Sequence, residues 1–185
     1  TTTLGGLGQD PDRQTKAGMV FDLAATDGQP LAAMSSDALP FRITADLLRG
    51  LQIYEQVHCN VTRASLRWLK KNGDPTFLRL RPDQIEQIGF DGDEMLFDRN
   101  SNLFEGFVLL REFFAFPRKF LGFRVTGLKS ILKKIKTDEC QLILEFDRVN
   151  DDLARHVDAR DIRLNCATAI NLFEETSNQI RLDDR

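Results

Sequence analysis

Apolar and polar residues alternate along much of the first half of the chain, as they do in half-buried β-strands. The alternating segments lie at 18–23, 39–43, 60–70, 76–81 and 85–90. Between the second and the third of them, apolar residues recur every three or four positions and predict a helix over 45–58, with Thr44 as its N-cap. The expected buried stripe of this helix is Leu47, Leu48, Leu51, Tyr54 and Val57.

The second half begins with a polar connector, 91–102, and continues with a stronger helical pattern. Ten of the fourteen residues in 103–116 are apolar, so this helix is expected to be buried or covered by a partner. Pro117 should end it. The remaining predicted elements are strands at 120–125, 141–147, near 162–164 and near 180–182, and short helices at 128–135 and 150–157.

Short strands interrupted by a few helices predict an α+β fold with mixed, mostly antiparallel strands. Residues 1–16 show no periodicity and are expected to be a flexible lead-in. The connector 91–102 divides the rest into two expected α+β subdomains, 17–90 and 103–185, or lies within one continuous domain.

Composition narrows the class of protein. The chain has 185 residues, 42% of them hydrophobic and 29% charged, and a net charge of −3, which is typical of a soluble globular domain and excludes a globally basic nucleic-acid binder. No apolar run is long enough for a membrane helix, and the start lacks both a signal-peptide pattern and a Met, so we expect a cytoplasmic piece of a longer protein. Cys59, Cys140 and Cys166 are widely spaced and are expected to be reduced thiols.

No catalytic or cofactor motif emerges from the sequence. It contains no GxSxG, HExxH or Walker loop, and its two histidines are far apart. Asp98, Asn100 and Asn102 imitate the start of a calcium-binding EF-hand loop, but Leu103 stands where that loop requires Gly. We therefore expect no catalytic residue, no metal and no cofactor, while a hydrolase built from dispersed carboxylates stays open as an alternative.

Positive charge is concentrated in 111–136, which holds eight basic residues against Glu112 alone. Five interleaved phenylalanines are expected to form one buried aromatic cluster: Phe113, Phe114, Phe116, Phe120 and Phe123. Four lysines lie opposite the apolar stripe of 128–135 and are expected to be exposed: Lys129, Lys133, Lys134 and Lys136. That lysine face is open to three interpretations, namely a solvated surface, a docking surface for an acidic partner, and a nucleic-acid site.

The segment 109–123 resembles the signature motif of the TssF family (also called ImpG or VasA), which are baseplate subunits of the bacterial type VI secretion system. The residues that carry the resemblance are Arg111, Glu112, Phe113, Phe114, Phe116, Pro117, Phe120 and Phe123.

A second element, 164–173, resembles the family's Cys-Thr-Pro-Ile-Val-Asn-Leu-Phe pattern through Cys166, Asn171, Leu172 and Phe173. Asn171 stands among apolar neighbours, so we expect its amide to be buried and hydrogen-bonded to backbone. Arg118 departs from the family, which is usually acidic at that position.

The resemblance implies a structural role with no catalysis, no cofactor and no small-molecule substrate. TssF proteins assemble as two copies with TssG, together with TssK and TssE, into wedges that surround the VgrG spike and support the tube and sheath. The resemblance also implies a cytoplasmic position at the inner-membrane-docked baseplate, without membrane insertion and without nucleic acid. The alternative is a nucleic-acid-binding module that uses 111–136, whose affinity would fall steeply with salt.

Overall fold

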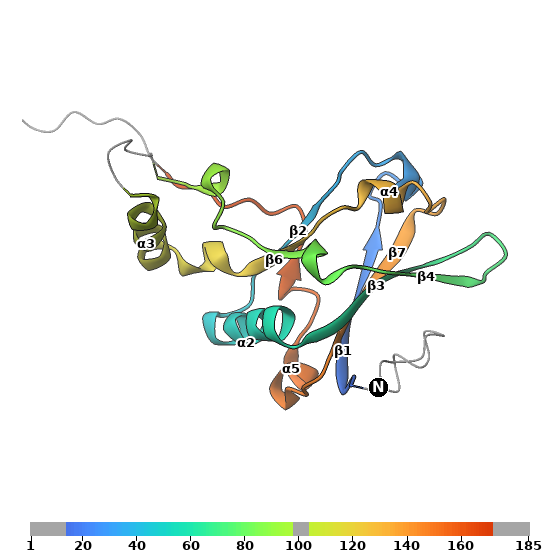
Figure 1. Cartoon of the computed structure of the whole chain (residues 1–185), viewed down its shortest axis with the longest axis horizontal. Coiled ribbons are helices and arrows are strands. Elements are labelled where there is room, and N and C mark those ends of the chain that lie inside the picture. The colour runs from blue at the N-terminus through green and yellow to red at the C-terminus, as the bar shows by residue number, and fades with distance from the viewer. Residues whose placement is uncertain (1–13, 98–103, 172–185) are drawn as a thin grey trace, which may run out of the picture.

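In the computed structural model, which describes residues 14–97 and 104–171, the chain forms two four-stranded antiparallel sheets (Figure 1). The first sheet has the order β1-β7-β3-β4, built from Ala17–Ala24, Glu139–Phe146, Val61–Leu69 and Pro75–Arg79. The second has the order β5-β6-β2-β8, built from Ile85–Gln87, Gly122–Val125, Leu39–Ile43 and Ile162–Arg163. The predicted α+β class and the antiparallel pairing are confirmed.

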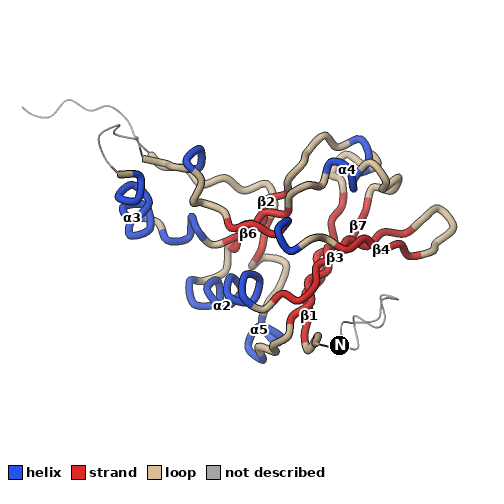
Figure 2. Tube along the Cα trace, viewed as in Figure 1, coloured by secondary structure: helices blue, strands red, loops and turns tan. Residues whose placement is uncertain are grey.

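Helices lie around the two sheets, with α3 at one extremity of the molecule and α4 toward the opposite side (Figure 2). The α-helices of the described residues are α2 (Leu47–Cys59), α3 (Glu105–Ala115), α4 (Lys129–Leu132) and α5 (Asp151–His156). Short 3-10 helices occupy Leu31–Ala33, Pro82–Gln84, Gly92–Glu94 and Pro117–Phe120, the last of which we call η4. Within the described part of the chain, no helix is both long and apolar enough to cross a membrane.

One hydrophobic core joins the two sheets. Phe41 of β2 and Phe123 of β6 stack with ring centroids 4.7 Å apart, and Phe21 of β1 packs against both rings. Each sheet combines strands from 17–90 with strands from 103–185. Most of the predicted lead-in, the end of the predicted connector and the predicted strand near 180–182 lie outside the described residues.

Helix α2 buries a different face from the predicted one. Its buried side consists of Gly50, Ile53, Gln56 and Val57, whereas Leu47, Leu48 and Leu51 are exposed. Gly50 carries no hydrophobic signal in the sequence, but its missing side chain lets the helix approach the sheet closely. A Cβ at Gly50 would lie 3.1 Å from Leu121 Cδ1. The predicted apolar stripe was therefore wrong for the first turns of α2.

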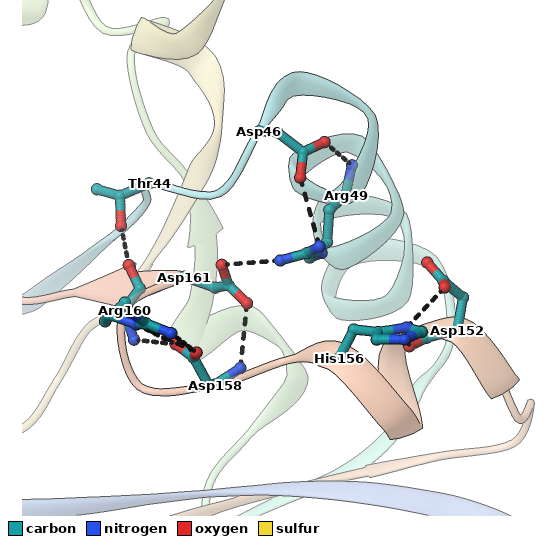
Figure 3. Close-up of polar contacts among 8 residues, drawn as sticks. All are labelled: Thr44, Asp46, Arg49, Asp152, His156, Asp158, Arg160 and Asp161. Carbon is teal, nitrogen blue, oxygen red and sulfur yellow. Dashed lines mark hydrogen bonds and ion pairs between the residues drawn. The ribbon is translucent and has the colours of Figure 1, made fainter.

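The N-terminus of α2 is capped by Asp46 and not by Thr44. The Asp46 carboxylate accepts a hydrogen bond of 3.1 Å from the backbone N–H of Arg49, while Thr44 Oγ1 donates to the carbonyl oxygen of Arg160. Asp161 completes the link, because its carboxylate accepts from Arg49 and from the backbone N–H of Asp158 (Figure 3). These bonds fix the segment after α5 against the start of α2.

Candidate assembly surface around helix α3

The TssF-like segment 109–123 forms a helix, a turn and a strand in direct succession. It contains the end of α3, all of η4 and the start of β6. Pro117 stands at the first position of η4, where a missing N–H costs nothing, and ends α3 as predicted. Gly122 then enters β6 where a Cβ would lie only 2.4 Å from the carbonyl oxygen of Phe41. The motif thus returns the chain from α3 into the core of the second sheet.

A buried ion pair holds α3 to this turn. The Lys119 ammonium group of η4 donates to Glu112 Oε2, and the two residues are 0% and 1% exposed. The other carboxylate oxygen, Oε1, accepts from the backbone N–H groups of Leu96 and Phe97 at 2.6 and 2.8 Å. Both oxygens of the buried carboxylate are therefore satisfied, as a buried charge requires. Glu112 thus connects α3, η4 and the segment before residue 98.

The charge of Glu112 is stabilised by these contacts. Burial on its own would raise the pKa of the Glu112 carboxyl, but the hydrogen bond from Lys119 and those from the two backbone N–H groups outweigh it and lower that pKa. Glu112 is therefore an anion at neutral pH. In the sequence, Glu112 stands out through the resemblance to the family, whereas Lys119 is one of the eight basic residues of 111–136. The available signal was that Glu112 is the one acidic residue of 111–136 and that Lys119 follows it by seven residues.

A second polar cluster holds the turn from the other side. Arg42 of β2 donates to the carbonyl oxygen of Lys119 at 2.6 Å. Glu94 lies between this arginine and Arg124 of β6, with N···O distances of 3.8 and 3.0 Å, and accepts from the backbone N–H of Gly89. Gly89 has a φ of 91°, and a Cβ there would lie 2.9 Å from the same Lys119 carbonyl oxygen. The backbone around Lys119 is thus fixed by two strands and a tight turn.

The predicted cluster of five buried phenylalanines is only partly right. Phe120 and Phe123 are buried, but Phe113, Phe114 and Phe116 are 51%, 77% and 39% exposed. The physical reason is that α3 is buried only along Val108 and Glu112, so side chains on its other faces point away from the core. The exposed set extends along the helix and forms what we call the α3 aromatic face: Phe104, Phe107, Leu110, Phe113, Phe114 and Phe116.

The α3 aromatic face has a helical spacing that suits contact with another helix. Phe107, Leu110 and Phe114 follow one another at intervals of three and four residues, which is the spacing of a seam between packed helices. Arg111 stands on the same helix and places its guanidinium 4.8 Å from the centre of the Phe97 ring. Arg118, where the family is usually acidic, is exposed in η4, which follows the helix. A partner here would meet exposed aromatic rings.

The described part of the second TssF-like element, 164–171, alternates between half-buried and exposed residues. Cys166 is half-buried, and its thiol lies 3.5 Å from the carbonyl oxygen of Leu164. Asn171 is exposed, so the predicted burial of its amide was wrong. The chain at this point has left β8 and no longer runs within a sheet, which removes the apolar surroundings that the neighbouring sequence indicated. Leu172 and Phe173 lie outside the described residues.

The lysine face of α4 and the turn after it is exposed at all four positions: Lys129, Lys133, Lys134 and Lys136. The opposite stripe is buried, as the spacing predicts: Leu128, Ile131, Leu132 and Ile135. The helix itself is shorter than predicted and spans Lys129–Leu132. A role of this face at an interface stays a prediction.

Reversing two of these charges should leave the fold intact. We expect the double variant Lys133→Glu/Lys134→Glu to change the free energy of unfolding by no more than about 0.5 kcal/mol, because exposed charges interact weakly through water. Urea denaturation of the variant and the parent protein measures the difference. A loss of several kcal/mol would show that the two side chains support the fold. A matched control is Lys70→Glu/Lys71→Glu, which reverses two exposed lysines in the β3–β4 turn.

Comparison with known proteins identifies the family of this chain. The family model "Type VI secretion system, TssF" matches residues 5–185. "Type VI secretion system component TssF1" of Pseudomonas aeruginosa is 30% identical over 187 residues, and the match covers 98% of this chain and 29% of the relative. This chain therefore spans less than a third of the length of that relative.

A solved structure has a similar fold. It is a chain of the TssK-TssF-TssG baseplate subcomplex of a type VI secretion system, determined by cryo-electron microscopy. The match has a TM-score of 0.59 and 17% sequence identity, and it covers 80% of this chain and 29% of that chain. The structural likeness supports the fold, and the family model accounts for almost the whole sequence. The chain belongs to the TssF family of type VI secretion system components.

Proposed function

We propose that this chain is part of a structural subunit of the type VI secretion system baseplate, and that it assembles with TssG and TssK. Membership in the TssF family supports the baseplate role, and the solved subcomplex with a similar fold contains TssF together with TssK and TssG. The observation that carries assembly on this chain itself is the α3 aromatic face. We propose TssG as the subunit that covers it.

The size of the α3 aromatic face supports an interface. A phenylalanine side chain offers about 150–250 Å² of surface, so the six exposed side chains together present on the order of 600 Å². Monomeric proteins expose largest apolar patches of roughly 300–600 Å², and a stable interface buries about 800 Å² per partner. The exposed apolar area of the face is thus at the upper end of what monomeric proteins expose, and it approaches the area that one partner buries in a stable interface.

The finer parts of the proposal come from the family resemblance. We propose that the full protein also contacts a second TssF copy, TssE and the VgrG spike, and that it acts in the cytoplasm at the inner-membrane-docked baseplate without entering the membrane. We further propose that it performs no catalysis and binds no small-molecule substrate. Among the described residues, no group of three or more His, Cys, Asp or Glu side chains is arranged to hold a metal ion.

The nucleic-acid alternative loses support from the geometry of the basic segment. Lys119 is buried on Glu112, and Arg124 is paired with Glu94 and Asp91. Arg111 lies over the Phe97 ring. Fewer basic side chains of 111–136 are therefore available to bind nucleic-acid phosphates than the sequence suggests. A log–log salt slope near zero in binding to single-stranded DNA would exclude this alternative, whereas a phosphate-binding groove would give about one unit per contact.

An aspartate in the α3 aromatic face should weaken the binding of TssG. We expect Phe114→Asp in the full-length protein to lower affinity for TssG at least tenfold, because a charge would be desolvated at a site now filled by an aromatic ring. The melting temperature should hardly change, since Phe114 is 77% exposed. Co-purification with TssG and with TssK, followed by titration calorimetry, measures the effect.

The matched control is Leu69→Asp at the end of β3, where another large apolar residue is exposed. We expect this variant to bind TssG normally. If Phe114→Asp retained the parent affinity for TssG, the assignment of TssG to the α3 aromatic face would be wrong. If it lost TssK and kept TssG, the face would belong to TssK.

A further inference from the structure

A groove of about 590 Å³ runs beside β1. Seven consecutive residues of the strand line it, from Ala17 to Leu23. Successive side chains of a strand point to opposite faces of the sheet, so a groove on one face would touch only every second residue. The groove therefore opens on the edge of β1, where the backbone itself is accessible.

The edge of β1 offers unpaired backbone groups. Within residues 14–97 and 104–171, β7 is the only strand that pairs with β1. The backbone N–H of Ala25 donates to Asp138 in the β1–β7 register, so the odd-numbered residues of the strand point their N–H and C=O groups toward β7. Gly18, Val20 and Asp22 consequently direct theirs toward the groove.

The other side of the groove is apolar and firmly held. Leu153 and Val157 of the α5 region, together with Ile162 and Leu164 around β8, form the wall opposite β1. The bonds of Asp161 to Arg49 and to the N–H of Asp158 attach this wall to α2 (Figure 3). Figure 1 shows α5 close to the start of β1. The groove is thus a slot between an open strand edge and an apolar wall.

The charges that line the groove are negative. Among the described residues that line it, the ionisable ones are Asp22 and Asp158. Asp158 already binds Arg160, with an N···O distance of 2.8 Å. Asp22 is exposed and accepts a hydrogen bond of 2.6 Å from the neutral side-chain amide of Gln141. An occupant with a basic side chain would give Asp22 an opposite charge.

Edge strands of stable proteins normally carry devices that prevent pairing, such as proline, lysine or a bulge within the strand. The eight residues of β1 contain no proline and no lysine, and Asp22 is the one charged residue among them. The strand is also long enough for several cross-strand hydrogen bonds. This edge is therefore open to an added strand.

We propose that the groove beside β1 binds an extended segment of another polypeptide, apolar on the side that faces the slot and basic near Asp22, as an added strand of the first sheet. Backbone hydrogen bonds to Gly18, Val20 and Asp22 hold the segment, and the apolar wall receives its alternate side chains. The site is distinct from the α3 aromatic face and does not depend on it.

A backbone-specific variant tests the proposal. Val20→Pro removes one N–H that points into the groove and leaves the β1–β7 hydrogen bonds in place, whereas Val20→Thr keeps both the N–H and the branched shape. The probe is a short synthetic peptide of alternating valine and lysine, titrated into the full-length protein by fluorescence anisotropy. We expect Val20→Pro to weaken binding about tenfold and Val20→Thr to leave it unchanged.

Two further measurements with the same peptides test the charge preference of the groove and whether a peptide fills it. A peptide of alternating valine and glutamate should bind at least tenfold more weakly than the lysine peptide, and hydrogen exchange at Val20 and Asp22 should slow when the lysine peptide is added. Three results would overturn the proposal: no binding of the lysine peptide, equal binding by Val20→Pro and Val20→Thr, or equal binding of the two peptides. Slow exchange at Val20 before any peptide is added would show that the protein's own chain or a second copy fills the groove, which also overturns it.

Discussion

Replacing Lys119 by methionine is expected to lower the free energy of unfolding by about 3–5 kcal/mol, because the change leaves the buried Glu112 carboxylate without its counter-charge. The two backbone N–H groups of Leu96 and Phe97 would still bind the other oxygen, but they do not neutralise the charge. Urea denaturation followed by circular dichroism measures the loss. Methionine keeps the length and most of the volume of lysine, so a packing defect contributes little.

The double variant Glu112→Gln/Lys119→Met is the control. It removes both charges and keeps a side-chain oxygen that can accept from the backbone N–H groups of Leu96 and Phe97, so it should recover much of the stability that Lys119→Met loses. A single variant as stable as the parent protein would mean that Lys119 contributes nothing to the fold. A double variant as unstable as the single one would assign the loss to packing and not to charge.

The contribution of the Glu112–Lys119 ion pair to stability should also depend on pH. The folded state lowers the pKa of Glu112, so the pair contributes stability above the unfolded pKa and loses it as pH falls through the folded pKa. Without Lys119, the largest contribution that lowers the pKa of Glu112 is lost, so Glu112 accepts a proton at a higher pH than in the parent protein. The difference in stability between the parent protein and Lys119→Met should therefore shrink as pH falls from neutral toward about pH 4. A difference that stays constant over this range would contradict the assignment.

The second large effect is expected at Phe123. Phe123→Ala should lower the free energy of unfolding by about 3–5 kcal/mol, since the ring is fully buried and stacks on Phe41 with 4.7 Å between centroids. Phe114→Ala, in the same motif, is the matched control and should change it by less than about 1 kcal/mol because its ring is largely exposed. Equal losses at the two positions would contradict the division of the motif into a buried part and an exposed part.

Local pattern predicted local structure well in this chain. The strand at 39–43 has its predicted limits, and the strand at 60–70 is shortened by one residue at each end, because alternation of side chains reports directly on a half-buried strand. The pairing of β1 with β7 joins segments more than 110 residues apart, and no local pattern carries that information. The groove beside β1 exists only through this long-range arrangement, so the sequence alone could not indicate it.

The TssF-like motif shows a different limit. Its phenylalanines look alike in the sequence, yet the fold buries Phe120 and Phe123 and exposes Phe114. The hydrophobicity of a side chain shows that its burial is favourable. It does not show whether the same chain or a partner protein buries it. The pairing of Glu112 with Lys119 was equally hidden, because charged residues are usually assigned to the surface.

The attachment of α3 to the rest of the fold should affect the affinity and the dissociation rate of a partner bound to this helix. Glu112 joins the helix to η4 and to the segment that precedes residue 98, while Arg42 holds the Lys119 carbonyl oxygen from the neighbouring sheet. A helix fixed in this way loses little conformational freedom when a second protein covers it, so more of the contact energy remains as affinity. We therefore expect Lys119→Met to accelerate dissociation of a subunit bound to the α3 aromatic face, even though Lys119 itself is buried and would touch no partner.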